Sequence, residues 1–183
     1  GAVYQWKLKD PDSAFVLVVD KARNDRQAVH ALSVMTLSLL LGKQAGLSEQ
    51  ALRVLGTGAL LHDIGARLIT PSILRNPARN RHEEKFFRAH CRNGYDEALQ
   101  AGALSPPILD AILSHHERCD GSGFPDRLMG NAIPLTARMV GIADRFDTLV
   151  NPGEPHLAIG PAEALATMWS RDQKGFDSGL LQL

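Results

Sequence analysis

The 183-residue sequence has only two cysteines, no excess of charge and no long apolar run. Cys91 and Cys119 show no metal-binding or redox spacing, so the sequence does not predict a disulfide-stabilised secreted domain. The formal net charge is zero, which excludes a basic field over the whole molecule that would attract DNA or an anionic membrane. Polar residues interrupt residues 28–41, the longest apolar region, well short of the ~20 residues of a membrane span. With no signal peptide recognisable, we expect a cytoplasmic protein with no membrane span and no DNA partner.

The composition predicts one domain with a substantial core, preceded by a short segment of different character. Hydrophobic residues make up 44% of the chain, enough for a single core at this length. Residues 3–8 alternate in polarity and residues 15–19 are rich in β-branched side chains, which predicts a β-hairpin or the end of an upstream domain. The composition changes near residue 24. We therefore expect an amino-terminal segment over residues 1–23 and a helical domain over residues 24–183.

From Arg26 onward the pattern is that of an all-α bundle. Residues 26–41 are apolar on nearly every side, as expected of a central buried helix. Ser48 is a predicted N-cap, and Gly65 is predicted to end the following helix in the left-handed conformation. Further helices are expected over the ranges 72–74, 82–101, 106–117 and 134–150, then one from about residue 161 and a short one at the end of the chain.

Histidines and aspartates stand on five of the expected helices. The candidate metal ligands are His30, His62, Asp63, His90, His115, His116 and Asp144. Imidazole and carboxylate without thiolate favour iron, manganese or zinc over magnesium or calcium. This number of ligands suits two ions that share a carboxylate. At this point the alternative of several unrelated core histidines stays open.

Three stretches resemble the motifs of a known family: His62-Asp63-Ile64-Gly65, the run His115-His116-Glu117-Arg118, and the glycine-rich loop over residues 120–125. In these stretches the chain resembles the HD-GYP family of HD-domain metal phosphohydrolases. The resemblance covers residues 24–183 and implies an HD-domain helical bundle. It also implies a bacterial signalling domain that hydrolyses cyclic di-GMP to the linear dinucleotide or to GMP. The implied cofactors are two divalent transition metals, iron or manganese before zinc, nickel or cobalt.

The resemblance assigns roles to individual positions. His30, His62, Asp63 and Asp144 match the ligands of one metal, and Asp63 would bridge to a second metal bound by His90, His115 and His116. The signature loop is carried by Gly121, Gly123, Phe124 and Pro125, with Phe124 in place of the usual tyrosine. The loop is either a turn that positions the helices or a part of the catalytic, substrate-contacting site, and it is also a candidate docking site for a diguanylate cyclase or another signalling protein. Glu117 and Asp147 are candidates for orienting the imidazoles. His82 and His156 match nothing and are expected on the surface.

Three departures from the family pattern concern the contacts to substrate and the number of metals. Ala66 stands where the family has a lysine that contacts substrate phosphate, so Arg67 and Arg75 are the cations we name as replacements. Arg26 stands where some relatives have a glutamate ligand for a third metal, which predicts a two-metal site. Residues 151–154 replace an arginine-containing segment of the family. The leading hypothesis is a cyclic di-GMP phosphodiesterase of reduced activity. The alternatives are a metal-bound receptor or interaction domain, and a phosphohydrolase acting on another nucleotide.

Overall fold

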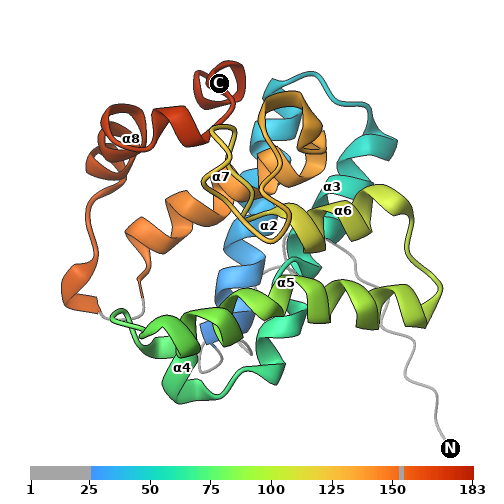
Figure 1. Cartoon of the computed structure of the whole chain (residues 1–183). Helices are drawn as coiled ribbons and strands as arrows, with labels where there is room; N and C mark the ends of the chain where they lie inside the picture. Colours follow the sequence, from blue (N-terminus) through green and yellow to red (C-terminus); the bar gives the residue numbers. More distant parts are fainter. Residues whose placement is uncertain (1–25, 153–154) are drawn as a thin grey trace, which may run out of the picture.

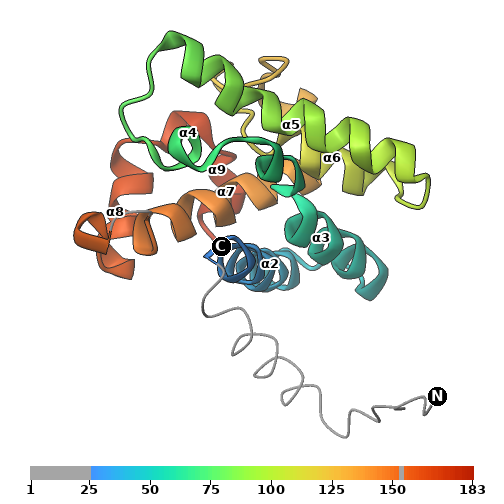
Figure 2. The ribbon, with the colours of Figure 1, turned by 90° about the horizontal axis from the view of Figure 1, so that it is seen from below.

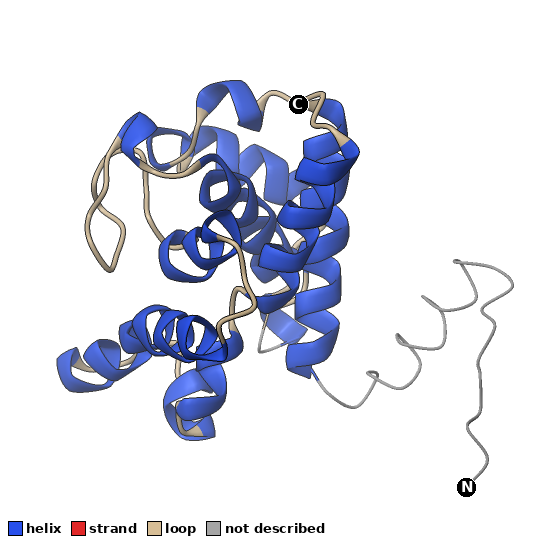
Figure 3. Ribbon diagram, turned by 90° about the vertical axis from the view of Figure 1, so that its right-hand side faces the viewer, coloured by secondary structure: helices blue, strands red, loops and turns tan. Residues whose placement is uncertain are grey.

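A computed structural model describes residues 26–152 and 155–183, and these residues form a bundle of helices joined by loops (Figure 3). Within these ranges there is no β-strand, only an isolated bridge between Asp120 and Met129. The prediction of an all-α bundle is confirmed. The predicted hairpin and the domain boundary near residue 23 lie outside the described residues.

The helices follow one another along the whole described chain (Figure 1). The α-helices are α2 (Arg26–Gln44), α3 (Glu49–Leu61), α4 (Pro71–Arg75), α5 (Arg81–Ala101), α6 (Pro106–Ser114), α7 (Leu135–Val150), α8 (Pro161–Ser170) and α9 (Ser178–Leu181). Short 3₁₀ helices are η1 (Ile64–Leu68), η2 (Gly130–Ala132), η3 (Pro155–Leu157) and η4 (Gln173–Gly175). The helix expected over residues 106–117 ends earlier, at Ser114. His115, His116 and Glu117 therefore lie outside the helix, in the turn after α6.

Local signals explain where several helices begin and end. The Ser48 side chain accepts a hydrogen bond from the Ala51 amide at the start of α3, as its prediction as an N-cap requires. At α5, Asn80 and Glu83 form a reciprocal capping box, and Gly102 ends the helix with φ 71°. Among the described residues, no helix is both long enough and apolar enough to cross a bilayer.

The bundle is organised around α2, α3, α6 and α7. Helix α2 packs against α3 and α7, while α6 contacts α3, α5 and α7 (Figures 1 and 2). The larger apolar cluster joins residues from these helices to the C-terminal segment and includes Val34, Leu55, Met139 and Met168. A smaller cluster around Ile112 lies between α5 and α6. These two clusters hold together the helices that carry the candidate ligands.

Gly65 does not cap a helix in the left-handed conformation, so that prediction is wrong. Its φ is not among the positive values of the described glycines, and it lies inside η1. A Cβ at this position would overlap the carbonyl oxygen of His90 and lie 2.6 Å from the amide nitrogen of Gly94. Gly65 is needed because the backbone of η1 runs directly against the backbone of α5. This close approach brings the end of α3 next to His90.

Candidate metal centre

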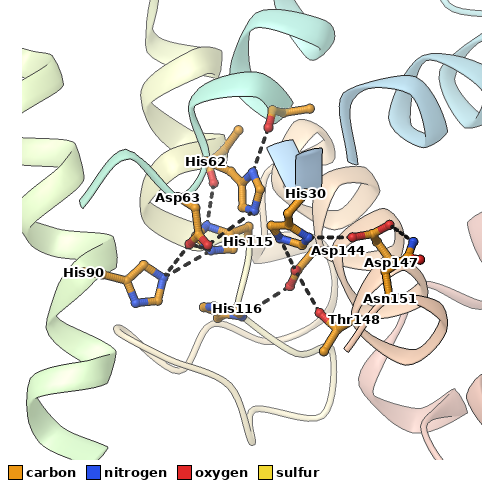
Figure 4. A network of polar contacts seen from close by, with 12 residues as sticks. His30, His62, Asp63, His90, His115, His116, Asp144, Asp147, Thr148 and Asn151 are labelled. Carbon is orange, nitrogen blue, oxygen red and sulfur yellow. Dashed lines mark hydrogen bonds and ion pairs between the residues drawn. The ribbon is translucent and has the colours of Figure 1, made fainter. Parts of the chain in front are cut away.

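The seven predicted ligands converge at one place from α2, the end of α3, α5, the turn after α6, and α7 (Figure 4). Their donor atoms form three overlapping groups, each with all donors within 4.8 Å of one another. One group holds His30, His62 and Asp144, and a second holds His90, His115 and His116 together with Cys91. The third group consists of His62, Asp63 and His115 and connects the other two. This division matches the expected two sites with Asp63 between them; that the side chains bind metal stays a prediction.

Three of the imidazoles are oriented by backbone carbonyl oxygens. Nδ1 of His62 lies 2.7 Å from the oxygen of Ala59, and Nδ1 of His90 lies 2.6 Å from that of Phe87. Nδ1 of His115 lies 3.0 Å from the oxygen of Ile112. A carbonyl oxygen can only accept, so Nδ1 carries the proton in each ring. The Nε2 atoms are directed to the centre, as metal-binding imidazoles require.

The surroundings of the His62 ring indicate whether these residues fit a metal. Its ring is 1% exposed, and Nε2 has no hydrogen-bond partner among the described residues. The nearest carboxylate oxygen, Oδ2 of Asp63, is 3.9 Å away. A buried imidazole nitrogen without a partner costs free energy unless it binds something. The residues present therefore fit a divalent cation on the Nε2 side of His62.

His30 is held between two aspartates of α7. Nε2 of His30 lies 3.3 Å from Oδ1 of Asp144, and Nδ1 lies 2.6 Å from Oδ2 of Asp147. Asn151 donates to the other oxygen of Asp147, at 2.8 Å. Burial alone would lower the pKa of His30, but the bonds to Asp144 and Asp147 outweigh it and raise the pKa to about 10. Asp147 thus fixes the ring of His30 while the opposite nitrogen faces the centre, the arrangement expected of an orienting carboxylate.

Asp63 lies at the junction of the two halves. Its Oδ1 is 3.2 Å from Nε2 of His90 and 3.6 Å from Nε2 of His115. Burial raises the pKa of Asp63, but the surrounding imidazoles outweigh this and hold it well below its usual range. Conversely, burial dominates at His62 and lowers its pKa to about 4, which keeps the imidazole neutral and able to coordinate. The centre therefore combines ionised carboxylates with at least one neutral imidazole.

The turn after α6 and the signature loop form one unit. The buried carboxylate of Glu117 accepts hydrogen bonds from the amides of Asp126 and Leu128, at 2.7 and 2.9 Å. A Cβ on Gly123 would lie 2.5 Å from Cα of Glu117, so only glycine allows the loop to lie against the turn. Glu117 thus holds the loop rather than bonding to an imidazole. Its predicted role as a candidate for orienting the imidazoles has no hydrogen bond to support it.

Aromatic rings and arginines border the centre on the side of α5. The ring of Phe124 lies 4.7 Å from that of His116, and the ring of Phe87 lies 5.2 Å from that of His90. Arg79 covers the Phe87 ring at 3.8 Å, and Arg88 covers the Phe124 ring at 4.8 Å. Phe124 therefore contributes to the wall of the centre through its ring, which its tyrosine counterpart would also supply.

The cations named from the sequence lie elsewhere. Ala66 is 2% exposed, and the guanidinium of Arg67 donates to Glu97 of α5 at 2.6 Å. Glu97 is seven positions beyond His90, about two helical turns along α5. Arg75 ends α4 in an exposed position, without a hydrogen bond or ion pair to the centre. His82 and His156 are exposed, as expected, and neither belongs to any of the three donor groups.

Sequence reasoning missed Cys91 and the arginine–aromatic pairs. Cys91 had no metal-binding spacing to mark it, and adjacency to His90 on a helix suggests divergence by about 100°. Its Sγ nevertheless lies 3.4 Å from Nε2 of His90. Arg79 lies in a polar, basic loop over residues 76–81, and its partner Phe87 carried no separate signal in the sequence.

Comparison with known proteins places this arrangement in a family. Residues 17–180 match the family model described as the HD domain. The chain belongs to the HD-domain family. The cyclic di-GMP phosphodiesterase response regulator RpfG of Xanthomonas campestris is 38% identical over 146 residues, which are 75% of this chain and 37% of RpfG. The cyclic di-GMP phosphodiesterase PA4108 of Pseudomonas aeruginosa is 32% identical over 162 residues, 88% of this chain and 39% of PA4108. The chain spans less than two fifths of the length of these two relatives. The predicted HD-GYP membership is confirmed.

Relatives with a different named substrate also match the HD-domain chain. The 3'3'-cGAMP-specific phosphodiesterase 1 of Vibrio cholerae is 36% identical over 134 residues, which are 72% of this chain and 30% of the relative. Among solved structures, the HDG"Y"P protein Bd1817 of Bdellovibrio bacteriovorus superposes with a TM-score of 0.74 at 22% identity, over 85% of this chain and 50% of Bd1817. The HD domain of the L. monocytogenes phosphodiesterase PgpH, solved in complex with cyclic-di-AMP, gives a TM-score of 0.57 at 16% identity over 90% of this chain and 88% of that chain. These structures support the fold alone.

Proposed function

We propose that this chain is a metal-dependent phosphodiesterase domain that hydrolyses cyclic di-GMP to the linear dinucleotide or to GMP. The observation that carries the proposal is the convergence of donors from five parts of the chain into two groups connected by Asp63. The relatives named as cyclic di-GMP phosphodiesterases support the substrate. Iron or manganese is the expected metal, with zinc, nickel or cobalt as other occupants.

The proposed roles follow from the positions of the side chains. His30, His62 and Asp144 would hold one ion, His90, His115 and His116 the other, and Asp63 would contact both. Two divalent cations held in this way would supply an activated water and neutralise the charge that develops on the phosphate. The hydrogen bond from Asp147 fixes the His30 ring, and the hydrogen bonds to Glu117 fix the loop beside His116. Phe87 and Phe124 offer ring faces next to the centre, beside which a nucleobase would lie.

We expect hydrolysis to be slow, because the phosphate-contacting cation of the family is missing. Ala66 supplies no charge, and the guanidinium of Arg67 is bound to Glu97. A cation aimed at the charge that grows on the phosphate contributes about 3–4 kcal/mol, or two to three decades in rate. Arg79 and Arg88 are nearer to the aromatic wall, but both are ion-paired with Glu84. Arg67, Arg79 and Arg88 are thus each paired with a glutamate, which supports slow hydrolysis.

The absence of the lysine at position 66 also favours a second candidate function. This is a metal-bound receptor or interaction domain that binds a cyclic dinucleotide without efficient turnover. Binding would use the metal centre and the aromatic wall, neither of which depends on position 66. A third candidate is hydrolysis of another nucleotide, and the relatives named as specific for 3'3'-cGAMP make that dinucleotide the first alternative to test.

One experiment separates the three candidates. Purified protein of verified metal content is incubated with cyclic di-GMP, 3'3'-cGAMP or cyclic di-AMP, and the products are resolved by chromatography. The proposed function predicts cleavage of cyclic di-GMP that is lost in Asp63→Asn and retained in His82→Ala, a change at an exposed histidine outside the centre. Binding of cyclic di-GMP without product indicates the receptor. Faster cleavage of another dinucleotide contradicts the proposed substrate.

A further inference from the structure

Cys91 lies where a ligand of the second ion would lie. Its Sγ is 3.4 Å from Nε2 of His90, and its thiol belongs to the donor group of His90, His115 and His116 within 4.8 Å. Ligand atoms around one tetrahedral zinc ion, at bond lengths of about 2.0–2.3 Å, are separated by roughly 3.3–3.8 Å. The group therefore needs only a small contraction to surround an ion.

Cys91 is buried, and its sulfur makes a polar contact with a candidate ligand. A buried cysteine usually packs as a small apolar side chain. Cys91 is 0% exposed and belongs to the core of the bundle, although it is a member of neither apolar cluster. The sulfur instead lies against the imidazole of His90, whose own Nδ1 is bound to the carbonyl oxygen of Phe87. The thiol of this core residue thus lies within contact distance of a predicted metal ligand, on the side of the candidate centre.

We propose that Cys91 is a protein ligand of the ion held by His90, His115 and His116. This inference rests on the proposed metal centre and adds a thiolate to its imidazoles and carboxylates. When the metal binds, the S–H bond of Cys91 breaks, a sulfur–metal bond forms and the proton passes to the solvent. Thiolate is a soft ligand, so the Cys91 site prefers zinc or iron to manganese. The two ions of one centre then differ in their ligands, one site with oxygen and nitrogen only and the other with sulfur.

Cobalt substitution tests the inference without measuring activity. The purified protein is loaded anaerobically with Co²⁺ under non-thiol reducing conditions, and its near-ultraviolet spectrum is recorded beside elemental analysis. We expect a sulfur-to-cobalt charge-transfer band in the native chain. The matched control is Cys119→Ser, which removes the other free cysteine, one that is part of no donor group. The band should persist in Cys119→Ser and disappear in Cys91→Ser, with circular dichroism verifying that the helices remain.

The outcomes separate this inference from the proposed function. Native protein that binds two equivalents of cobalt without the band overturns the role of Cys91 and leaves the metal centre intact. Protein that binds no metal overturns both. A band that survives in Cys91→Ser also overturns the assignment. If Cys91→Ser does not fold, X-ray absorption of the zinc-loaded native and Cys119→Ser proteins decides, because a sulfur shell at about 2.3 Å is required in both.

Discussion

Replacing Gly65 with alanine should destabilise the fold and the metal centre together. The added Cβ would overlap the His90 carbonyl oxygen and lie 2.6 Å from the Gly94 nitrogen, closer than the 3.0 Å below which a neighbour must shift. Both atoms belong to the backbone of α5, so no side-chain rotation relieves the clash. Overpacking typically costs about 1–3 kcal/mol. We expect the upper end of that range for Gly65→Ala, which lowers the melting temperature by roughly 6–12 °C in a protein of this size.

Thermal unfolding followed by circular dichroism, with elemental analysis of the same samples, measures both effects. Metal content should fall because separating η1 from α5 widens the 3.2 Å distance between Oδ1 of Asp63 and Nε2 of His90. The control is Gly160→Ala, since a Cβ there meets nothing within 4 Å and the backbone is not left-handed. A Gly65→Ala protein that melts with the native chain and keeps its metal would refute the reasoning.

Three further changes test the centre. Asp63→Asn should lower the metal content at both sites while His82→Ala leaves it unchanged; equal losses by elemental analysis would show the ligand assignment to be wrong. Asp147→Ala should weaken metal binding about 10–100-fold by releasing the His30 ring, as measured by competition with a chelator, and unchanged affinity would contradict its orienting role. Ala66→Lys should accelerate single-turnover hydrolysis of cyclic di-GMP by about two to three decades. Ala66 is buried, so the melting curve of the Ala66→Lys protein is measured beside its rate. If this variant folds but hydrolyses cyclic di-GMP at the native rate, another group performs the role of the lysine.

The fold was largely predictable because its signals are local. Caps such as Ser48 and Gly102 are recognised from neighbouring residues, and the apolar patterns between them define the helices. The place where α6 ends was less predictable, because its final turn is set by Glu117 holding a loop further along the chain.

The grouping of the candidate ligands was predictable from motifs, but their surroundings were not. Glycine is required at position 65 because of a backbone contact with α5, which is distant in the sequence. The ion pair between Arg67 and Glu97 likewise joins residues that are far apart in the sequence. Cys91 could not be recognised as a candidate ligand either, since this role depends on the contact between its Sγ and Nε2 of the neighbouring His90. Such features depend on tertiary contacts, which a single sequence does not reveal.

The spread of donors along the chain links metal supply to the survival of the fold. Ions bound between α2 and α7, and between α5 and the turn after α6, would act as cross-links between distant parts of the chain. A ligand that binds only the folded state stabilises it by about 4 kcal/mol when present at a thousand times its dissociation constant. Domain stabilities are commonly about 5–15 kcal/mol, so this would be a large share of the total. In a metal-starved cell, the amount of folded protein would therefore fall along with any activity, and the domain's lifetime would follow the available metal.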